Sequence, residues 1–554
     1  MAFIERFVQP QFDSYEDFRE NFHINVPDNF NFAFDVMDVI AEEDPDRLAM
    51  IWTNEAGEEQ SFTFSKMKEM SNRTANYFAS LGIGKGDHVM LVLKRHYEFW
   101  YAIMALSKLG AVVIPATNLL MEKDITYRVE KGDVKAIVCT SDGVVAEEVE
   151  KSVQHSGADV TLIIAKGQRA GWHTFDDMAA HSPTFPRPAG AAATTRDDVL
   201  LLFFSSGTTG MPKMVEHDHA YPLGHIVTGS FWHNVVPGGR HLTVADTGWG
   251  KALWGKLYAQ WMGETTVFTY DFDKFNPKDL LEKMEKYQIT TFCAPPTIYR
   301  FLIQEDFAQY DLSSLTYATT AGEALNPEVF NRFKELTGLE IKEAFGQTET
   351  TVTLGTFLWM EPVPGSMGKP AAGYNTCIVD EEGNDVHIGT VGEIAVRFDP
   401  ANKPIGLMLG YYNEPEATER ALGNGLYRTG DQAWMDENGF FWYVGRTDDV
   451  IKSSGYRIGP FEVESALMEH EAVLETAITA VPDPVRGQVV KATVVLNHGW
   501  TPSEELKKAL QDHVKHTTAP YKYPRIVEFV EELPKTISGK IRRVEIRERD
   551  AQKN

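Results

Sequence analysis

The sequence predicts an α/β protein with a large N-terminal domain of parallel βαβ-type sheets and a small, mobile α+β domain at its C-terminus. Strand and helix patterns alternate from about residue 88, which indicates parallel strands with helices on the faces of the sheets. A stretch at about 365–447 is rich in Gly, Tyr, Asp and extended runs, and it predicts a β-rich subdomain. Short helix and strand patterns then alternate again to the end of the chain. We therefore place the large domain at 1–447 and the small domain at 448–554.

The first part of the chain predicts the parallel sheets. Residues 1 to about 35 are polar and aromatic, and we expect a helical or irregular lead-in. Apolar residues recur at spacings of three and four over 98–109, which is typical of a helix. Short apolar runs that predict strands lie at 88–93, 111–114, 135–139, 160–165 and 199–203. Residues 181–197 are rich in Pro, Ala, Gly and Thr, which predicts a linker.

The later elements are shorter. In the β-rich subdomain, extended runs lie at 376–379, 393–397 and 440–444. In the small domain, helical patterns cover 462–468 and 504–516, and extended patterns cover 475–481, 489–496 and 526–529. A compact α+β domain fits this order of elements.

Composition limits the classes of function. A chain of 554 residues has room for about three or four domains or subdomains. Its hydrophobic share of 43% and charged share of 24% are those of a soluble globular protein. The formal net charge of −26 argues against a nucleic-acid partner. Anionic small ligands then require local positive sites.

Cysteine usage and the N-terminus bear on location. The three cysteines, Cys139, Cys293 and Cys377, lie far apart in sequence, which fits neither a disulfide framework nor a zinc site. The first residues lack a basic region followed by a long apolar run, so we expect no signal peptide. No stretch approaches the ~20 apolar residues that a membrane span requires. We expect a cytoplasmic protein without a membrane span.

The most informative stretch is 204–213, Phe-Ser-Ser-Gly-Thr-Thr-Gly-Met-Pro-Lys, directly after the apolar run at 199–203. Glycines and small residues let backbone N–H groups turn toward an anion. Donor hydroxyls and one positive charge come from Ser205, Ser206, Thr208, Thr209 and Lys213. Only two residues separate Gly207 from Gly210, so this is not a Walker A loop. The stretch predicts phosphate binding; the alternative is an ordinary turn after a strand.

This stretch resembles the phosphate loop of the acyl-adenylate-forming superfamily, which includes acyl-CoA synthetases, adenylation domains of peptide synthetases and luciferases. Each short motif alone is usually a solvated loop. Five further segments match the superfamily in the same order, at 321–327, 343–350, 427–431, 445–458 and 534–540. Together with the phosphate loop, they identify the chain as a member of the superfamily.

The resemblance implies an ATP/AMP site. It assigns Phe345 to stacking on the purine, Thr348 to the α-phosphate, and Asp431 to the ribose hydroxyls. It assigns Glu349 to Mg²⁺, which takes few protein carboxylates and several phosphate oxygens. The remaining nucleotide-site candidates are Ser206, Gly207, Thr208, Thr209, Gly210, Lys213, Gly322, Glu323, Ala324, Glu343, Gln347, Arg446 (ribose) and Arg457 (phosphates).

The last motifs imply a moving domain. Lys540 matches the lysine that the small domain inserts beside the α-phosphate, and Asp448 matches the hinge. Gly455 matches the route of the pantetheine thiol, where a side chain would obstruct it. Arg525 belongs to a basic cluster with Lys515, His516 and Lys522 that is a candidate site for the phosphates of coenzyme A. The alternative interpretation of this cluster is a solvated basic face.

The implied reaction is ATP-dependent ligation of a carboxylic acid to coenzyme A. Such an acid is already ionised at neutral pH, so the first step needs no general base. It needs the two anions brought together and the developing charge stabilised, and the catalytic candidates are Lys540, Thr348 and Glu349. The products are acyl-AMP and pyrophosphate, and the thiol of coenzyme A then yields acyl-CoA and AMP.

The finer pattern resembles the medium-chain acyl-CoA synthetase branch, near the acetyl-CoA synthetases. Two segments, 213–217 and 246–249, are typical of that branch. The acetate enzymes carry a tryptophan where this chain has Gly346, so we expect room for a longer or branched acyl chain. The acyl-pocket candidates are Trp249, Gly250, Ala321 and Gly346.

Alternatives remain for this pocket and for the reaction. The aromatic segment 246–261 is either a pocket wall or an amphipathic helix whose Lys251 and Lys256 snorkel to solvent. The acid could be aromatic, or the acceptor a carrier protein. A luciferase-like oxygenase and a non-catalytic nucleotide-binding protein are further classes, and a homo-oligomer is possible.

Overall fold

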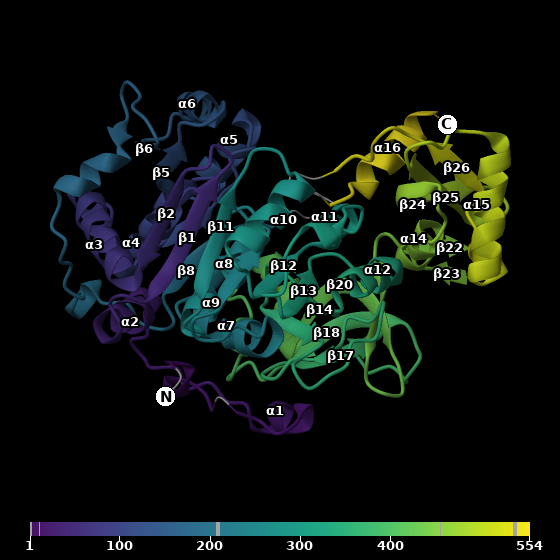
Figure 1. Cartoon of the computed structure of the whole chain (residues 1–554), viewed down its shortest axis with the longest axis horizontal. Helices are drawn as coiled ribbons and strands as arrows, with labels where there is room; N and C mark the ends of the chain where they lie inside the picture. Colours follow the sequence, from purple (N-terminus) through teal and green to yellow (C-terminus); the bar gives the residue numbers. More distant parts are fainter. Residues whose placement is uncertain (1–2, 10, 206–210, 455, 536–539, 554) are drawn as a thin grey trace.

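The computed structural model describes residues 3–9, 11–205, 211–454, 456–535 and 540–553. Over these residues the strands form four sheets, three in a large N-terminal part and one in a smaller C-terminal part (Figure 1). This confirms the predicted α/β class. The predicted domain boundary at 447/448 stays a prediction; the first strand of the C-terminal part is β22, which begins at Ile451.

The first sheet has eight strands. In spatial order they are β19 (Gly410–Tyr411), β9 (Lys213–Asp218), β8 (Val199–Ser205), β4 (Val112–Pro115), β3 (His88–Val92), β5 (Val134–Thr140), β6 (Thr161–Ala165) and β7 (His173–Thr174). From β8 to β7 every pair is parallel. β9 and β19 add antiparallel strands beside β8. The strands predicted near residues 88, 111, 135, 160 and 199 are all present.

The second sheet has nine strands. In order they are β16 (Lys369–Pro370), β15 (Val352–Gly355), β14 (Ile341–Gly346), β13 (Tyr317–Ala321), β12 (Thr291–Ala294), β10 (Arg240–Thr243), β11 (Thr266–Asp271), β1 (Leu48–Asn54) and β2 (Glu59–Thr63). The run from β14 to β1 is parallel, and antiparallel strands close both edges. The carboxyl ends of the parallel strands therefore lie along one edge.

Two smaller sheets follow. The β-rich subdomain is an antiparallel sheet of β17 (Asn375–Val379), β18 (Gly392–Arg397), β20 (Leu426–Met435) and β21 (Phe441–Arg446). The C-terminal part contains β23 (Tyr456–Ile458), β22 (Ile451–Ser453), β25 (Gly487–Leu496), β24 (Val473–Asp483) and β26 (Ile526–Phe529). Its helices are α14 (Pro460–Met468), α15 (Glu504–Thr517) and α16 (Arg543–Lys553).

The helices of the large part cover the sheets. The longest are α3 (Phe64–Ser80) and α4 (Glu98–Leu109), and every residue of α4 is buried. The others are α1 (Tyr15–Asn21), α2 (Asp38–Glu43), α5 (Glu122–Lys131), α6 (Val145–Ser156), α7 (Tyr221–Ile226), α8 (Gly250–Lys256), α9 (Tyr258–Met262), α10 (Pro277–Lys286), α11 (Pro296–Leu302), α12 (Pro327–Thr337) and α13 (Pro415–Leu422). Within the described part of the chain, none of them is both long and apolar enough to cross a membrane.

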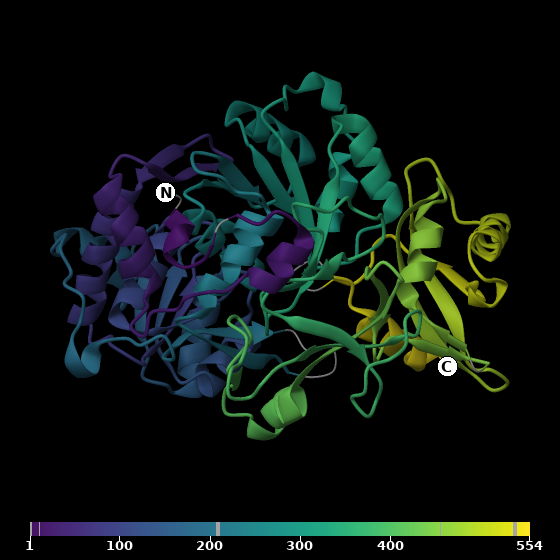
Figure 2. The same ribbon diagram turned by 90° about the horizontal axis from the view of Figure 1, so that it is seen from below.

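The lead-in is packed against the large domain. Figure 2 shows the purple N-terminal segment lying over the central elements. Phe12 and Phe18 contact Phe231 at ring-centroid distances of 5.6 and 4.7 Å, and Phe18 also meets Trp359 at 5.2 Å. Burying these aromatic rings gives an otherwise irregular segment a fixed place on the sheet.

A buried ionic cluster joins the two large sheets beside α8. His96, after β3, lies 2.8 Å from the carboxylate of Asp271, which ends β11. Arg95 lies 3.4 Å from Asp246, whose other oxygen accepts a hydrogen bond from the N–H of Gly248 at 2.9 Å. A Cβ at Gly248 would lie only 2.2 Å from the backbone nitrogen of Thr117, so only glycine fits this close approach. The cluster therefore positions the start of α8.

The aromatic segment 246–261 is not one amphipathic helix. It breaks at Leu257 into α8 and α9, and all of its large aromatics except half-buried Trp249 are buried. Lys256 is 2% exposed, so the interpretation as a snorkelling lysine is wrong at that position. Both faces of these short helices pack inside the protein.

Candidate functional site

The candidate site lies at the carboxyl ends of the parallel strands. Ser205 ends β8, Ala321 ends β13 and Gly346 ends β14. Ligands of open α/β sheets bind at this edge because loops from several strands converge there. The predicted residues Ser206, Gly207, Thr208, Thr209 and Gly210 lie outside the described residues. The chain resumes before Lys213, the first residue of β9.

Asp431 lies at the centre of a hydrogen-bonded cluster. One carboxylate oxygen accepts from the Tyr443 hydroxyl at 3.2 Å, and the other from the Gln347 amide at 2.5 Å and from Arg446 at 3.4 Å. Arg446 is also 3.6 Å from Asp448, the predicted hinge residue. Burial raises the pKa of Asp431, and the positive charges of Arg446 and Lys540 oppose this rise. The structure thus brings together predicted residues from three motifs.

The Thr348-Glu349 pair is held on both sides. The Thr348 carbonyl lies 2.7 Å from Nε2 of His217, and the Glu349 carbonyl accepts from the N–H of Met408 at 2.8 Å. The Glu349 carboxylate accepts a hydrogen bond from the Tyr411 hydroxyl at 3.0 Å. Burial raises the pKa of Glu349, while that hydrogen bond and the charge of Lys213 oppose the rise.

The 321–327 motif borders an open space. Gly322 has φ +105° and a Cβ there would meet nothing within 4 Å. The side chain of Glu323 accepts from Thr297 at 3.2 Å, and Ala324 is half-buried beside it. Glu343 is buried, burial raises its pKa well above the usual range, and it accepts from the N–H of Leu325 at 3.3 Å.

Phe345 lies on β14, between Glu343 and Gly346 in the chain. It is the residue before Gly346 on β14, it is half-buried, and it packs on the apolar cluster that contains Leu354. The predicted adenine-side residues therefore lie on β14 and in the segment after β13.

Lys540 of the C-terminal part reaches this region. Burial lowers the pKa of Lys251, and the charge of Lys540 lowers it further. The same charge acts on Asp431. The charge of Lys540 thus acts on both the Asp431 cluster and the start of α8, and its role in adenylate formation stays a prediction.

The expected open space at Gly346 is not there. A Cβ at this position would lie 2.4 Å from the carbonyl oxygen of Thr351 and 2.6 Å from the ring of Trp254. Trp254 is 7% exposed, and its Nε1 donates to the Tyr221 hydroxyl at 3.0 Å. Gly346 is required so that this ring can pack against the strand, and Trp254 fills the space that the sequence assigned to substrate.

The other pocket candidates surround the start of α8. Trp249 precedes the helix and is half-buried, and Gly250 begins it next to Phe203. Lys251 donates to the carbonyl of Ala321 at 2.7 Å, which links the helix to the end of β13. Trp249 and Gly250 are thus linked through α8 to Ala321 at the end of β13.

Two predicted residues, Arg457 and Arg525, make contacts outside this group. Arg457 is exposed and pairs with Glu381 at 3.5 Å, and Arg525 donates to the Tyr523 hydroxyl at 2.7 Å. Gly455 lies outside the described residues. In the basic cluster, Lys515 pairs with Asp512 at 2.7 Å and Lys522 with Glu462 at 2.5 Å. The roles of these residues toward coenzyme A stay predictions.

Sequence reasoning missed Tyr411, Tyr443 and His217, whereas Trp254 lies in the aromatic segment 246–261 that the sequence offered as a pocket wall. Tyr443 lies within the predicted run 440–444, and His217 lies in the segment 213–217, but neither residue type by itself indicates a hydrogen bond to a distant motif. Tyr411 lies 62 positions from Glu349. No local pattern predicts such long-range contacts.

The residues present fit a magnesium ion carried by phosphates. No cluster of three or more His, Cys, Asp or Glu that could hold a metal occurs in the described ranges. Glu349 offers a half-buried carboxylate that accepts a side-chain hydrogen bond from Tyr411. Mg²⁺ commonly takes one or two protein carboxylates and completes its shell with water and phosphate oxygens.

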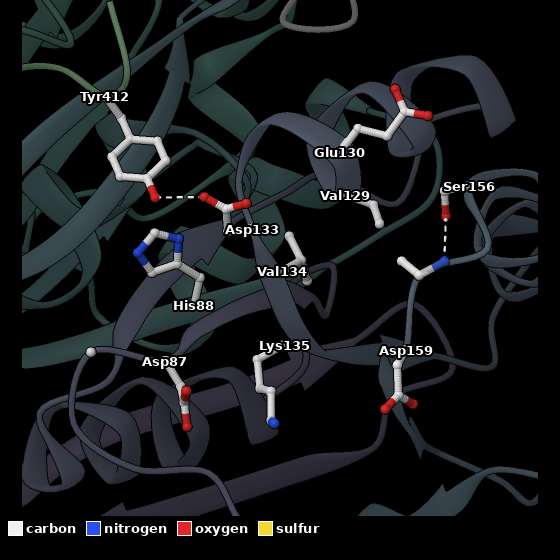
Figure 3. A pocket seen from close by; sticks show the side chains of 12 residues that line it. Asp87, His88, Val129, Glu130, Asp133, Val134, Lys135, Ser156, Asp159 and Tyr412 are labelled. Atoms are coloured by element: carbon white, nitrogen blue, oxygen red, sulfur yellow. Dashed lines mark hydrogen bonds between the residues drawn. The ribbon is translucent and has the colours of Figure 1, made fainter.

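A surface cavity of about 600 Å³ lies at the opposite, amino-terminal edge of the first sheet (Figure 3). It surrounds the starts of β3 and β5, where the Tyr412 hydroxyl donates to Asp133 at 2.7 Å. Its wall carries carboxylates together with His88 and Lys135. None of the predicted site residues that the structure describes lines it, so we do not place the chemistry there.

Comparison with protein families matches residues 37–412 to the AMP-binding enzyme family. Residues 462–540 match the AMP-binding enzyme C-terminal domain. Among curated proteins, the mitochondrial acyl-coenzyme A synthetase ACSM3 of Homo sapiens is 41% identical over 98% of this chain and 94% of its own length. The mitochondrial acyl-coenzyme A synthetase ACSM5 of Homo sapiens is 41% identical over 95% and 91%.

Solved structures agree on the fold. The anthranilate CoA ligase AuaEII, in complex with anthranoyl-AMP, has a TM-score of 0.87 at 28% identity and covers 95% of this chain and 98% of its own. A benzoate CoA ligase from Burkholderia xenovorans has a TM-score of 0.81 at 26% identity, covering 94% and 100%. The expected cytoplasmic location is contradicted, because the curated relatives carry mitochondrial names.

Proposed function

Because the chain belongs to the AMP-binding enzyme family, we propose that it is an acyl-CoA synthetase, an ATP-dependent acid–CoA ligase. A carboxylate and ATP form acyl-AMP and pyrophosphate, and the thiol of coenzyme A then forms acyl-CoA and releases AMP. Relatives named acyl-coenzyme A synthetase align over nearly the whole chain, which supports this reaction. The convergence of Asp431, Glu349 and Lys540 is the observation that carries it.

In the first step a substrate carboxylate oxygen attacks the α-phosphorus of ATP, and the bond to pyrophosphate breaks. The acid is ionised at neutral pH, so the residues hold and stabilise rather than remove a proton. Asp431 and Arg446 orient the ribose, and Lys540 and Thr348 stabilise charge at the α-phosphate. Glu349 would hold Mg²⁺, which supplies charge neutralisation on the phosphates when bound.

In the second step the thiolate sulfur of coenzyme A attacks the acyl carbonyl carbon, and AMP leaves. In this proposal the C-terminal part turns about Asp448, so that Gly455 replaces Lys540 beside the adenylate. Arg525 then meets a phosphate of coenzyme A. The exposed Arg457 is available for the same exchange, since its ion pair with Glu381 is at the surface.

We assign a medium-chain or branched aliphatic acid as the favoured substrate. Trp249, Gly250 and Ala321 bound the proposed pocket, and Trp254 closes it beside Gly346. Each methylene in such a pocket is worth about 1–3 kcal/mol. Trp254→Ala is therefore expected to shift kcat/KM about tenfold or more toward longer acids, without changing the KM for ATP.

An aromatic acid is the second candidate. Two solved structures of similar fold are named as ligases of anthranilate and benzoate. The half-buried indole of Trp249 offers a flat apolar surface to such a ring.

The test is acid-dependent release of pyrophosphate from ATP, measured over acids from acetate to dodecanoate together with branched acids, benzoate and anthranilate. Release that requires acid, with acyl-CoA and AMP formed once coenzyme A is added, is the expected result. Release without thioester would indicate another acceptor, such as a carrier protein. No release with any acid would contradict the proposal.

A further inference from the structure

Tyr411 lies between two of the proposed catalytic elements. It is 8% exposed and belongs to β19, whose residues pair antiparallel with β9. Tyr411 lies opposite Val215, and hydrogen bonds from the N–H groups of Leu409 and Tyr412 to β9, each 2.8 Å long, fasten the backbone on both sides. Its side chain is therefore held by a strand pair that begins at Lys213, directly after the phosphate loop.

The two parts of this side chain contact different groups. The hydroxyl donates to Oε1 of Glu349 at 3.0 Å. The ring lies beneath the ammonium of Lys213, with Nζ 4.6 Å from the ring centroid. In this geometry the Tyr411 hydroxyl is the donor and the Glu349 carboxylate is the acceptor.

The backbone beside Glu349 is fixed by the same region. The N–H of Met408, three residues before Tyr411, donates to the Glu349 carbonyl at 2.8 Å. His217, on β9, contacts the Thr348 carbonyl at 2.7 Å. Because the main chain is already held, the Tyr411 hydroxyl is left to orient the carboxylate itself.

We propose that Tyr411 is a positioning residue that couples the magnesium carboxylate Glu349 to the phosphate-loop cation Lys213. The proposal rests on the roles assigned to these two residues in the proposed function. The hydroxyl holds one oxygen of Glu349 and leaves the other oriented for a metal ion. The ring holds the ammonium of Lys213 at a set distance from that carboxylate.

Each contact predicts a separable effect. Hydrogen bonds to ligating carboxylates are part of a metal site, and their loss typically costs about 10–100-fold in metal affinity or activity. The cation–π contact orients Lys213 toward phosphate oxygens and does not depend on the hydroxyl. Removing the hydroxyl should weaken magnesium-dependent binding alone, and removing the whole ring should also weaken ATP binding without magnesium.

The neighbouring residue supplies a matched control. Tyr412 also donates its hydroxyl to a carboxylate, that of Asp133 at 2.7 Å, but at the amino-terminal edge of the sheet (Figure 3). Tyr412→Phe therefore removes the same chemical group, one residue away, without touching the proposed site.

The experiment is calorimetric titration of the full-length protein with ATP over a series of magnesium concentrations. Tyr411→Phe is expected to raise the magnesium concentration for half-maximal tightening of ATP binding about tenfold and to leave the magnesium-free Kd unchanged. Tyr411→Leu is expected to raise the magnesium-free Kd as well, by severalfold. Tyr412→Phe should match the wild type in both quantities.

A Tyr411→Phe protein with wild-type magnesium dependence would overturn the proposal. So would a Tyr411→Phe protein whose magnesium-free Kd rises as much as its magnesium requirement, because that pattern indicates a general structural effect. Thermal unfolding of each variant shows whether it is folded. If Tyr411→Leu does not fold, Tyr411→Phe alone still tests the role of the hydroxyl. A wild-type protein that binds no ATP would instead refute the proposed function.

Discussion

The amino-terminal edge of the first sheet and the carboxyl-terminal edge that carries the candidate site are built differently. At the amino-terminal edge, a cavity of about 600 Å³ is open, and the carboxylates and the lysine that line it lie at the protein surface. At the carboxyl-terminal edge, Asp431, Glu349 and Lys540 converge from different motifs, and two of them have pKa values displaced by burial. Hollow volume and reactive chemistry are thus separate properties here. The site is located by converging, desolvated polar groups.

The largest expected difference between the two edges is the effect of Lys540→Ala on adenylate formation. Loss of the ammonium beside the α-phosphate is expected to lower adenylate formation by about 10²–10³-fold, the range for a lost transition-state donor. The thioester step from supplied acyl-adenylate should keep most of its rate, because the lysine is exchanged out before it. Lys135→Ala, at the amino-terminal edge, should change neither step; equal loss of both steps in Lys540→Ala would contradict the assigned role.

Asp431→Asn and Asp133→Asn together compare a buried carboxylate at the candidate site with an exposed carboxylate at the amino-terminal edge. Both Asp431 and Asp133 accept a hydrogen bond from a tyrosine hydroxyl, at 3.2 and 2.7 Å. A hydrogen bond to a charged group contributes about 1.5–3 kcal/mol, so the KM for ATP should rise about 10–100-fold in Asp431→Asn. Steady-state kinetics on Asp133→Asn should give the wild-type KM; a similar rise there would remove the distinction between the two edges.

Gly346→Ala tests how tightly Trp254 packs against β14. Its Cβ would lie 2.4 Å from the Thr351 carbonyl oxygen, so the strand or Trp254 must shift. Overpacking of this kind costs about 1–3 kcal/mol in the free energy of unfolding, which denaturant titration can measure. Gly84→Ala is the control, since a Cβ there meets nothing within 4 Å. If Gly346→Ala were as stable as Gly84→Ala, the tight fit of Trp254 would be refuted.

The last expected effect concerns a buried cation. Burial, together with the charge of Arg95, lowers the pKa of Lys256 to about 7. Between pH 7 and the usual lysine pKa of about 10.4 the unfolded chain binds more protons than the folded one, so stability rises with pH. The slope from this group is about 1.4 kcal/mol per pH unit.

Lys256→Met should remove that slope, whereas Lys135→Met at the exposed edge should keep it. Unfolding free energies measured across the alkaline range test both variants. A Lys256→Met protein with the wild-type pH slope would show that the lysine is charged in the folded state throughout the range.

Much of the fold was predictable because its signals are local. Helix α4 matches the predicted 98–109 residue for residue, and β26 matches 526–529, since the period of apolar residues is set by the geometry of one element. The split at Leu257 was not predictable, because buried aromatics on all sides carry no helical period. The expected cytoplasmic location was also contradicted, because cellular location is not set by how the residues of the fold pack.

The sequence by itself determined the α/β class, the order of the strands along the chain and the motifs that identify the family, because each depends on residues close together in the chain. Tertiary structure alone decided that Trp254 fills the space beside Gly346, that Lys256 is buried, and that Tyr411 joins Glu349 to Lys213. These contacts join residues that are distant in sequence. They form only when the folded chain brings β9, β19, α8 and the end of β14 together.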